Sequence, residues 1–418
     1  MVGQAGAGKT KPATLRTVGI VGAGLMGGGI GMSCAEAGQT VIFLDRDEDA
    51  LKRGFQLIEK NYARSVSRGS KTQAFVDACR GRMSGITDVA GFADCDLVVE
   101  AVFEELEIKK KIFAQLDAVC KPGAFMCSNT SALNIDAIAA QTKRPEFVMG
   151  THFFSPANVM KLLENVRGKH TSDLTVSTMM AWGKKIGKWP ILVGNCPGFV
   201  GNRMIGFYSR GARMCVSNAA ALPERVDAVS TKFGFRMGPF AMADLVGLDL
   251  GIQAWKKRGE YDPERVPDHA LIESGRKGQK TNAGWFDYDE KTRASSPSPK
   301  VAAMLEQVAA TNGVTREPID DEEIERRLLF PLINEGFKIL DEGMAQRPAD
   351  IDVCYVHGYG FPRVRGGPMF YADQVGVATV KQTLEKMGIA TAPLLEECVA
   401  SGQSLAKFWA TRAKKAKL

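Results

Sequence analysis

The sequence predicts an α/β protein in which a doubly wound sheet domain is followed by two related all-α domains. Three observations support this fold class. An apolar run at residues 17–21 leads directly into a G-x-G-x-x-G pattern at 22–27, and a second apolar run ends at Asp45. Short apolar runs then alternate with helical stretches as far as residue 194. Beyond that residue helical patterns dominate, and one long segment occurs twice.

The glycine pattern follows a strand, opens a helix and predicts a Rossmann-type nucleotide site. Gly22 permits a tight turn, Gly24 lets a pyrophosphate approach the backbone, and Gly27 lets helix and strand pack closely. Asp45 is placed to accept hydrogen bonds from the ribose hydroxyls, which favours NAD because a 2'-phosphate would meet a carboxylate. Arg46 is the one residue that argues for NADP. A turn that uses its glycines only for packing is the other alternative.

The first domain is expected at residues 16–194, with a helical arm inserted at about 47–84. Basic residues such as Lys60 and Arg64 lie along this arm. Such charges usually mark a solvated face, but they can also meet a phosphorylated part of a substrate. Further strands of this domain are expected at residues 97–101, 124–129, 147–152 and 190–193.

The helical part contains an internal duplication. The segments that begin at Leu222 and Arg347 share several ordered matches, which pair Pro223 with Pro348, Asp227 with Asp352, and Asp244 with Asp373. We expect a first helical domain at 195–290, a linker at 291–318 and a second helical domain at 319–418. Because the duplicated unit supplies a pseudo-partner within the chain, the sequence predicts a monomer.

Composition excludes several classes of protein. Of the 418 residues, 45% are hydrophobic and 24% are charged, and no apolar run approaches the length of a membrane span. Nine cysteines without C-x-x-C spacing predict reduced thiols rather than disulfides or a zinc site. The net charge of +7 suits small anionic ligands, but acidic residues interleave with the basic ones and no nucleic-acid motif accompanies them. We therefore expect no membrane span, no bound metal and no nucleic acid.

Two short motifs stand at the ends of the sequence. Residues 3–10, GQAGAGKT, fit the P-loop pattern, but only two residues precede them and Lys11-Pro12 follows. Residues 1–15 are therefore expected to be a leader or linker, and a P-loop ATPase is the alternative. Ala416-Lys417-Leu418 differs by one small residue from the S-K-L peroxisomal address, and a basic tail that ends this way by chance is the alternative.

His152 and Glu164 form the candidate catalytic pair. His152 ends an apolar run at the C-terminal edge of the expected sheet, where ligands of such folds bind. A lone histidine is more often structural, but Glu164 lies close enough in the chain to set a carboxylate beside the imidazole. Such a pair fixes the tautomer and makes a base suited to removing a hydroxyl proton. His357 has no acidic residue at this spacing and is expected to be structural.

Five segments carry a resemblance to a known family. HFFSPANVMKLLE, SNTSALNI, GNCPGFVGNRM, GFRMGPFAMADLVGLD and GQKTNAGWFDYD resemble the L-3-hydroxyacyl-CoA dehydrogenases of fatty acid β-oxidation, and are most similar to the dehydrogenase half of the peroxisomal multifunctional members. The resemblance runs from about Arg16 to the end of the sequence and does not include an enoyl-CoA hydratase half. It implies NAD as cofactor, an acyl-CoA thioester as substrate, a separate enoyl-CoA hydratase as a partner, and a peroxisomal location, or otherwise a cytoplasmic one.

The resemblance also assigns roles to residues by motif. It implies that His152 and Glu164 are the catalytic pair and that Ser131 and Asn202 bind the substrate oxygen. Cofactor contacts fall on Ser131, Ser155, Glu104, Lys109 and Lys280. Ser155 stands where short members have Asn, so this sequence departs from their pattern there. The arm lacks the short members' serine and lysine for CoA at matching positions, and Lys60 or Arg64 is expected to substitute.

The activity that follows is NAD-dependent oxidation of (3S)-3-hydroxyacyl-CoA to 3-ketoacyl-CoA. One alternative is a dehydrogenase of a small polar hydroxy acid on the same scaffold, against which the basic arm argues. Another is a nucleotide-binding scaffold without catalysis, against which the intact set of His152, Glu164, Ser131 and Asn202 argues. The sequence leaves the acyl chain length open.

Overall fold

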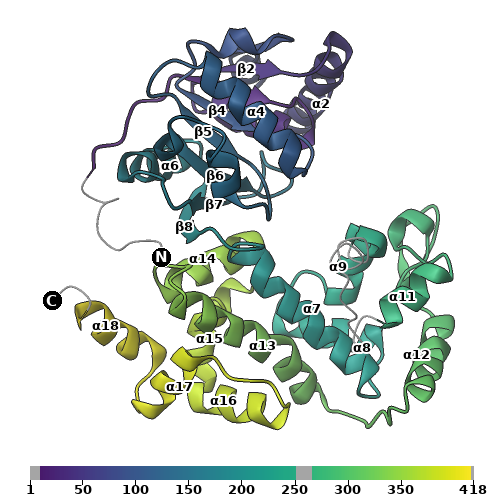
Figure 1. The fold of residues 1–418 in the computed structure, drawn as a ribbon. Helices are drawn as coiled ribbons and strands as arrows, with labels where there is room; N and C mark the ends of the chain where they lie inside the picture. The colour runs from purple at the N-terminus through teal and green to yellow at the C-terminus, as the bar shows by residue number, and fades with distance from the viewer. Residues whose placement is uncertain (1–9, 251–265, 416–418) are drawn as a thin grey trace. The chain divides into compact units, whose positions relative to one another are not determined.

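The computed structural model describes residues 10–250 and 266–415 (Figure 1). The P-loop-like residues 3–9 and the tripeptide Ala416-Lys417-Leu418 lie outside this range. The chain divides into two compact units. The first comprises Met1–Arg203 with Ile339–Tyr359, and the second comprises Met204–Lys338 with Gly360–Leu418. In the described ranges, no helix has the length and apolar character that crossing a bilayer requires.

The first unit is built on a sheet that has eight strands in the described residues, in the order β3-β2-β1-β4-β5-β6-β7-β8. Neighbouring strands are parallel, except that β6 and β7 pair antiparallel. The order 3-2-1-4-5-6 is that of a doubly wound Rossmann sheet, with its switch point between β1 and β4. This confirms the expected fold class. The strands are β1 (Thr17–Val21), β2 (Thr40–Leu44), β3 (Met83–Ile86), β4 (Leu97–Glu100), β5 (Phe125–Ser128), β6 (Val148–Phe153), β7 (Leu162–Arg167) and β8 (Trp189–Gly194).

Two strands, β3 and β7, are absent from the sequence-based expectations. β3 is short and only partly buried, so its residues show no apolar run. β7 is buried but carries Glu164 and Asn165 in its middle, which is why LLENVR does not look like a core strand. A charged residue is tolerated inside this strand because its carboxylate has hydrogen-bond partners within the unit.

Helices cover the sheet of the first unit. The expected arm consists of α2 and α3, and the Asp47 carboxylate caps the start of α2 by accepting a hydrogen bond from Ala50. The arm packs closely on the glycine loop at Gly54, which has no side chain. A Cβ on Gly54 would lie only 2.5 Å from the Ala23 carbonyl oxygen. The helices are α1 (Leu25–Glu36), α2 (Glu48–Ser67), α3 (Gln73–Arg80), α4 (Leu106–Val119), α5 (Ile135–Ala139) and α6 (Asp173–Lys185), with 3₁₀ turns at Val89–Phe92 and Pro145–Phe147.

A late segment of the chain, residues 339–359, also belongs to the first unit, although the sequence suggests a place for it in the second helical domain. Within it α14 (Pro348–Gly358) packs on β7 and β8. Ahead of α14, the Met344 carbonyl accepts a hydrogen bond from the Gly194 N–H at the end of β8. The outer edge of the sheet is thus covered by residues far along the chain.

The second unit is mainly helical. Residues 291–318, expected to be a linker, contain the short strand β10 and the helix α12. Two helices have residues in both units. α7 (Gly201–Ser217) begins in the first unit and continues in the second, and α13 (Asp321–Asp341) begins in the second and ends in the first. The other elements are α8 (Pro223–Phe233), α9 (Pro239–Val246), α11 (Val266–Glu273), β9 (Phe286–Tyr288), β10 (Ser295–Pro297), α12 (Pro299–Thr311), α15 (Pro368–Val375), α16 (Val377–Lys386), α17 (Pro393–Ala400) and α18 (Leu405–Lys415), with 3₁₀ turns at Gln279–Thr281 and Arg363–Arg365.

The two copies of the duplicated segment have the same local structure. α8 and α14 each have 11 residues, and α9 and α15 each have 8. The aspartates that end the matching motif also have matching partners. Asp244 accepts hydrogen bonds from the backbone N–H groups of Trp285 and Phe286, and Asp373 accepts them from two successive N–H groups at the start of α18. In both copies, the aspartate at the corresponding position therefore anchors the segment that follows.

Candidate active site

Two adjoining pockets lie along the C-terminal ends of the strands of the first unit. The larger, of about 530 Å³, is lined by the glycine loop, Asp45 and residues of α2. The smaller, of about 350 Å³, is lined by His152, Ser131 and Asn202, among others. Met26, Ala101 and Val102 line both pockets, so the two form one groove at the switch point of the sheet. The switch point is where doubly wound sheets of this kind bind dinucleotides.

The glycine loop has the geometry that a pyrophosphate site needs. Gly22 has a φ of 95°, in the region that favours glycine, and a Cβ on Gly27 would lie 1.8 Å from the Gly22 carbonyl oxygen. By contrast, a Cβ on Gly24 would meet no atom within 4 Å. Gly24 is also the N-cap of α1 and has no capping side chain, so the helix N-terminus is open to an anion.

Gly27→Ala and Gly24→Ala are therefore expected to fail in different ways. Gly27→Ala should lower the free energy of unfolding by about 3 kcal/mol or more, because its methyl group meets backbone rather than a movable side chain. Gly24→Ala should fold normally but bind NAD about tenfold more weakly or worse, since the methyl group occupies the space of the pyrophosphate. Urea unfolding and NAD titration of both variants check this. A stable Gly27→Ala protein, or tight NAD binding by Gly24→Ala, would contradict it.

Asp45 is fixed at the end of β2. One carboxylate oxygen accepts a hydrogen bond from Ala23 N at 2.9 Å, and the other accepts one from Arg46 N at 2.8 Å. Asp45 therefore braces the glycine loop and lines the pocket at once. The Arg46 guanidinium is engaged by the Asp47 carboxylate at 3.1 Å.

Asp45→Ala is expected to reduce the preference for NAD over NADP about ten- to a hundredfold, because a charged hydrogen-bond acceptor for the ribose is lost. The ratio of kcat/KM for the two cofactors is the measurement. If Asp45 acted only by its hydrogen bond with Ala23, its loss would weaken the binding of both cofactors equally and leave the ratio unchanged. Asp49→Ala, which removes an exposed acid nearby on α2, is the matched control. An unchanged ratio in Asp45→Ala would overturn this role.

His152 and Glu164 face each other across the β6–β7 pair. The two residues are direct partners in the antiparallel register, and His152 Nδ1 lies 2.8 Å from Glu164 Oε2. Both side chains are buried. Because the carboxylate accepts at Nδ1, that nitrogen carries the proton and Nε2 is left as the acceptor. The imidazole lines the smaller pocket, so the arrangement presents a base to a ligand there.

Glu164 is also held from its other side. Its Oε1 accepts hydrogen bonds from Val200 N at 3.2 Å and Gly201 N at 3.0 Å, at the start of α7. The N-terminus of a helix favours a negative charge. Cys354 of α14 contacts the same oxygen, and burial raises the pKa of this thiol well above its usual value, so it stays protonated. The carboxylate is thus fixed by three elements besides its own strand.

Ser131 and Asn202 lie together on the wall of the smaller pocket. Asn202 Nδ2 donates to the Ser131 carbonyl oxygen at 3.2 Å. Glu104 Oε1 accepts hydrogen bonds from Thr130 Oγ1 at 2.6 Å, Ser131 N at 2.7 Å and Ser131 Oγ at 3.1 Å. Desolvation opposes ionisation of Glu104, but these hydrogen bonds and the charge of Lys109 together outweigh it and hold the pKa of Glu104 below its usual range. Glu104 is therefore a charged acceptor that sets the loop carrying Ser131.

Lys109 lies behind the pocket wall. Its Nζ is 2.6 Å from Glu100 Oε1 and 3.4 Å from Glu104 Oε2, and its side chain is 1% exposed. Among the described residues, those that line the two pockets include Glu104 but not Lys109. Glu100 also accepts hydrogen bonds from Val102 N and Ser128 Oγ. The structure thus places Lys109 as the partner of two carboxylates.

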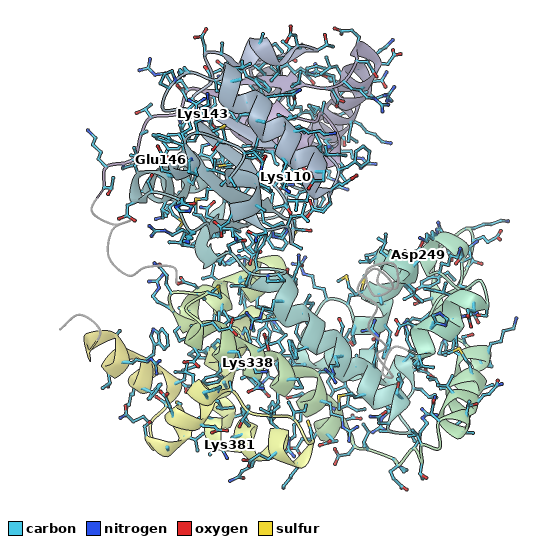
Figure 2. The ribbon with its side chains drawn as sticks, in the orientation of Figure 1. Lys110, Lys143, Glu146, Asp249, Lys338 and Lys381 are labelled. Carbon is cyan, nitrogen blue, oxygen red and sulfur yellow. The ribbon has the colours of Figure 1, made fainter. Side chains whose placement is uncertain are left out.

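The other predicted site residues lie in different places. Ser155 lines the smaller pocket. Lys60 and Arg64 are exposed on α2, and the nearby Arg53 lines the larger pocket. Lys280 belongs to the second unit, where its Nζ forms an ion pair with Asp249, labelled in Figure 2.

Three pocket or support residues escape the sequence-based prediction: Glu100, Asn129 and Tyr359. Glu100 ends the apolar run LVVE, and a carboxylate at the C-terminal end of a strand is a sequence signal that indicates a site residue. Asn129 Oδ1 accepts a hydrogen bond from the Phe153 backbone N–H at 2.9 Å. Nothing in the sequence marks Asn129 except its position after a strand. No local sequence signal marks Tyr359, because its contact with Asn202 joins residues 157 positions apart.

Comparison with known proteins agrees with this geometry. Residues 17–196 match the family model of the 3-hydroxyacyl-CoA dehydrogenase NAD-binding domain. Residues 198–288 and 324–406 match the C-terminal domain of 3-hydroxyacyl-CoA dehydrogenase. The peroxisomal bifunctional enzyme of Homo sapiens is 44% identical over 387 residues, which cover 88% of this chain and 53% of that protein. The chain therefore spans about half the length of the curated relatives it matches.

Solved structures lead to the same family. 3-Hydroxybutyryl-CoA dehydrogenase from Escherichia coli is 27% identical with a TM-score of 0.79, over 92% of this chain and 98% of that one. The dehydrogenase part of multifunctional enzyme 1 from C. elegans is 30% identical with a TM-score of 0.69, over 93% and 91%. With its NAD-binding domain and its C-terminal helical region both matched, the chain belongs to the 3-hydroxyacyl-CoA dehydrogenase family.

Proposed function

We propose that the chain oxidises (3S)-3-hydroxyacyl-CoA to 3-ketoacyl-CoA with NAD, as a step of fatty acid β-oxidation. The observation that carries this proposal is the pair of His152 and Glu164 at 2.8 Å, facing a pocket that Ser131 and Asn202 also line. The glycine loop and Asp45 border the adjoining pocket, as a dinucleotide requires. Family membership supports both the cofactor and the substrate class.

The residues of the site divide the work in this proposal. His152 Nε2 accepts the proton of the substrate hydroxyl, and Glu164 stabilises the imidazolium that forms. Asn202 holds the substrate oxygen as it becomes a carbonyl, together with Ser131 once its hydroxyl has turned from Glu104 to the substrate. NAD, when bound, supplies the hydride acceptor. Proton transfer by a positioned base contributes about 10²- to 10⁴-fold to the rate, and orientation of the reactants supplies much of the rest.

Reduction of NAD in the presence of candidate substrates tests the proposal. A series of 3-hydroxyacyl-CoA thioesters of increasing chain length should reduce NAD, and free small hydroxy acids should not. Turnover of the free acids alone would favour the alternative dehydrogenase on the same scaffold. NAD binding without turnover of either class would favour a scaffold without catalysis. The series also gives the chain-length preference.

Location and partners complete the proposal. Relatives are named as peroxisomal β-oxidation enzymes, and we propose a peroxisomal location with Ala416-Lys417-Leu418 as its address. A fluorescent fusion with and without these residues tests this. We further propose that the chain is a monomer, because the duplicated helical segment supplies a pseudo-partner, and that an enoyl-CoA hydratase provides its substrate. Light scattering that finds a stable dimer would contradict the monomer.

A further inference from the structure

We propose that Tyr359 is a positioning residue of this site, which fixes the orientation of the Asn202 amide so that Nδ2 can donate to the substrate oxygen. The inference rests on the function proposed above and adds to it a residue from the far end of the chain. Tyr359 directly follows α14 and lines the same pocket as His152 and Ser131. Its hydroxyl is 2.7 Å from Asn202 Oδ1.

The hydrogen-bond partners of Asn202 determine which way its amide points. On one side is the Ser131 carbonyl oxygen, which can only accept a hydrogen bond, so Nδ2 must face it. The opposite side of the amide is then Oδ1, which can only accept, so the Tyr359 hydroxyl must donate. One N–H of the Asn202 amide is used by Ser131. The second N–H remains for a ligand in the pocket.

Tyr359 is held so that it can serve as this donor. Its ring stacks on Tyr355 at 4.9 Å and meets Phe154 edge-on at 5.5 Å. A Cβ on Gly201 would lie 2.3 Å from the ring, so the glycine makes room for it. Burial, and secondarily the charge of Glu164, raises the pKa of Tyr359 well above its usual value. The hydroxyl therefore keeps its proton and donates.

The consequence concerns the strength of Asn202 as a donor as well as its direction. A hydrogen bond received at Oδ1 polarises the amide and strengthens the N–H groups on the other side. Without Tyr359, the amide would have one fixed partner instead of two and would rotate more freely. We expect Tyr359→Phe to lower kcat about five- to tenfold, the value of one hydrogen bond of this kind. KM for NAD should not change.

A double-mutant cycle with Asn202→Ala separates positioning from a merely structural role. If Tyr359 acts through Asn202, Tyr359→Phe should cost about five- to tenfold in kcat in the parent but almost nothing in the Asn202→Ala background. Tyr208→Phe is the matched control. It removes another buried hydroxyl, bonded to Ser230 at 2.7 Å in the second unit, and should leave kcat unchanged. Equal losses in both backgrounds would overturn the inference.

A crystal structure of Tyr359→Phe tests the inference without relying on activity. The Asn202 amide should turn away from its position in the parent, and Nδ2 should no longer be held against the Ser131 carbonyl. An unchanged Asn202 would overturn the positioning role, whatever the kinetics. If the parent protein turns over no 3-hydroxyacyl-CoA, the proposed function fails, and the crystal structure still decides whether Tyr359 orients Asn202.

Discussion

His152→Ala is expected to lower kcat about 10³-fold while leaving the fold and NAD affinity intact, because it removes the group that accepts the hydroxyl proton. Glu164 keeps two backbone hydrogen bonds at the start of α7, so its carboxylate remains satisfied in the variant. Glu164→Gln should cost about 10²-fold, since a neutral amide cannot stabilise an imidazolium. If the two residues act as one unit, the double variant should lose little beyond His152→Ala.

Turnover and melting temperature must be measured together for these variants. A structural role for the pair would lower the melting temperature, and the residual activity would follow the folded fraction. His170→Ala, which removes an exposed histidine, is the control and should behave as the parent does. Near-normal turnover in a well-folded His152→Ala protein would contradict the proposed mechanism.

Lys109→Met is expected to lower the free energy of unfolding by about 3 kcal/mol or more, because it leaves the buried Glu100 carboxylate without its cation. Glu100 is fully buried, and Lys109 is 1% exposed. The two hydrogen bonds from Val102 N and Ser128 Oγ remain, which places the expected loss near the lower end of the range for broken buried pairs. Urea unfolding is the measurement.

The next residue supplies the control for this experiment. Lys110, labelled in Figure 2, pairs with the exposed Glu107 at 2.8 Å, one turn earlier on α4. Lys110→Met should cost less than about 1 kcal/mol, as exposed ion pairs contribute little. Combining Lys109→Met with Glu100→Gln should recover part of the loss, because no charge is then left buried. Equal destabilisation by Lys109→Met and Lys110→Met would show that burial of the pair does not matter.

The sequence predicts those parts of the site whose residues lie close together in the chain. The glycine loop and Asp45 follow from residues 17–45, where strand, turn and helix signals agree within one short segment. His152 and Glu164 are also close in the chain, and the antiparallel pair that joins them spans only residues 148–167. The sequence therefore predicts their proximity, although it does not predict β7 itself.

The rest of the site depends on contacts between segments that lie far apart in the sequence. Nothing near Tyr359 in the sequence points to Asn202, because that contact exists only after α14 has packed on the sheet. The position of Lys109 has a similar cause. Its motif suggests a cofactor contact, but its buried location depends on how α4 packs and on Glu100 nine residues earlier. Tertiary packing, rather than local pattern, decides which polar side chains reach a pocket.

The membership of residues 339–359 in the first unit has a consequence for the synthesis of this protein. The strands of the sheet are complete once residue 194 has left the ribosome, yet α14 follows only when Gly358 has been made. During that interval β7 and β8 lack the helix that covers them, including the side of Leu162 that Gly358 later approaches closely. Nascent chains at this stage expose apolar strand surface, and that is the interval in which a chaperone would have most to protect.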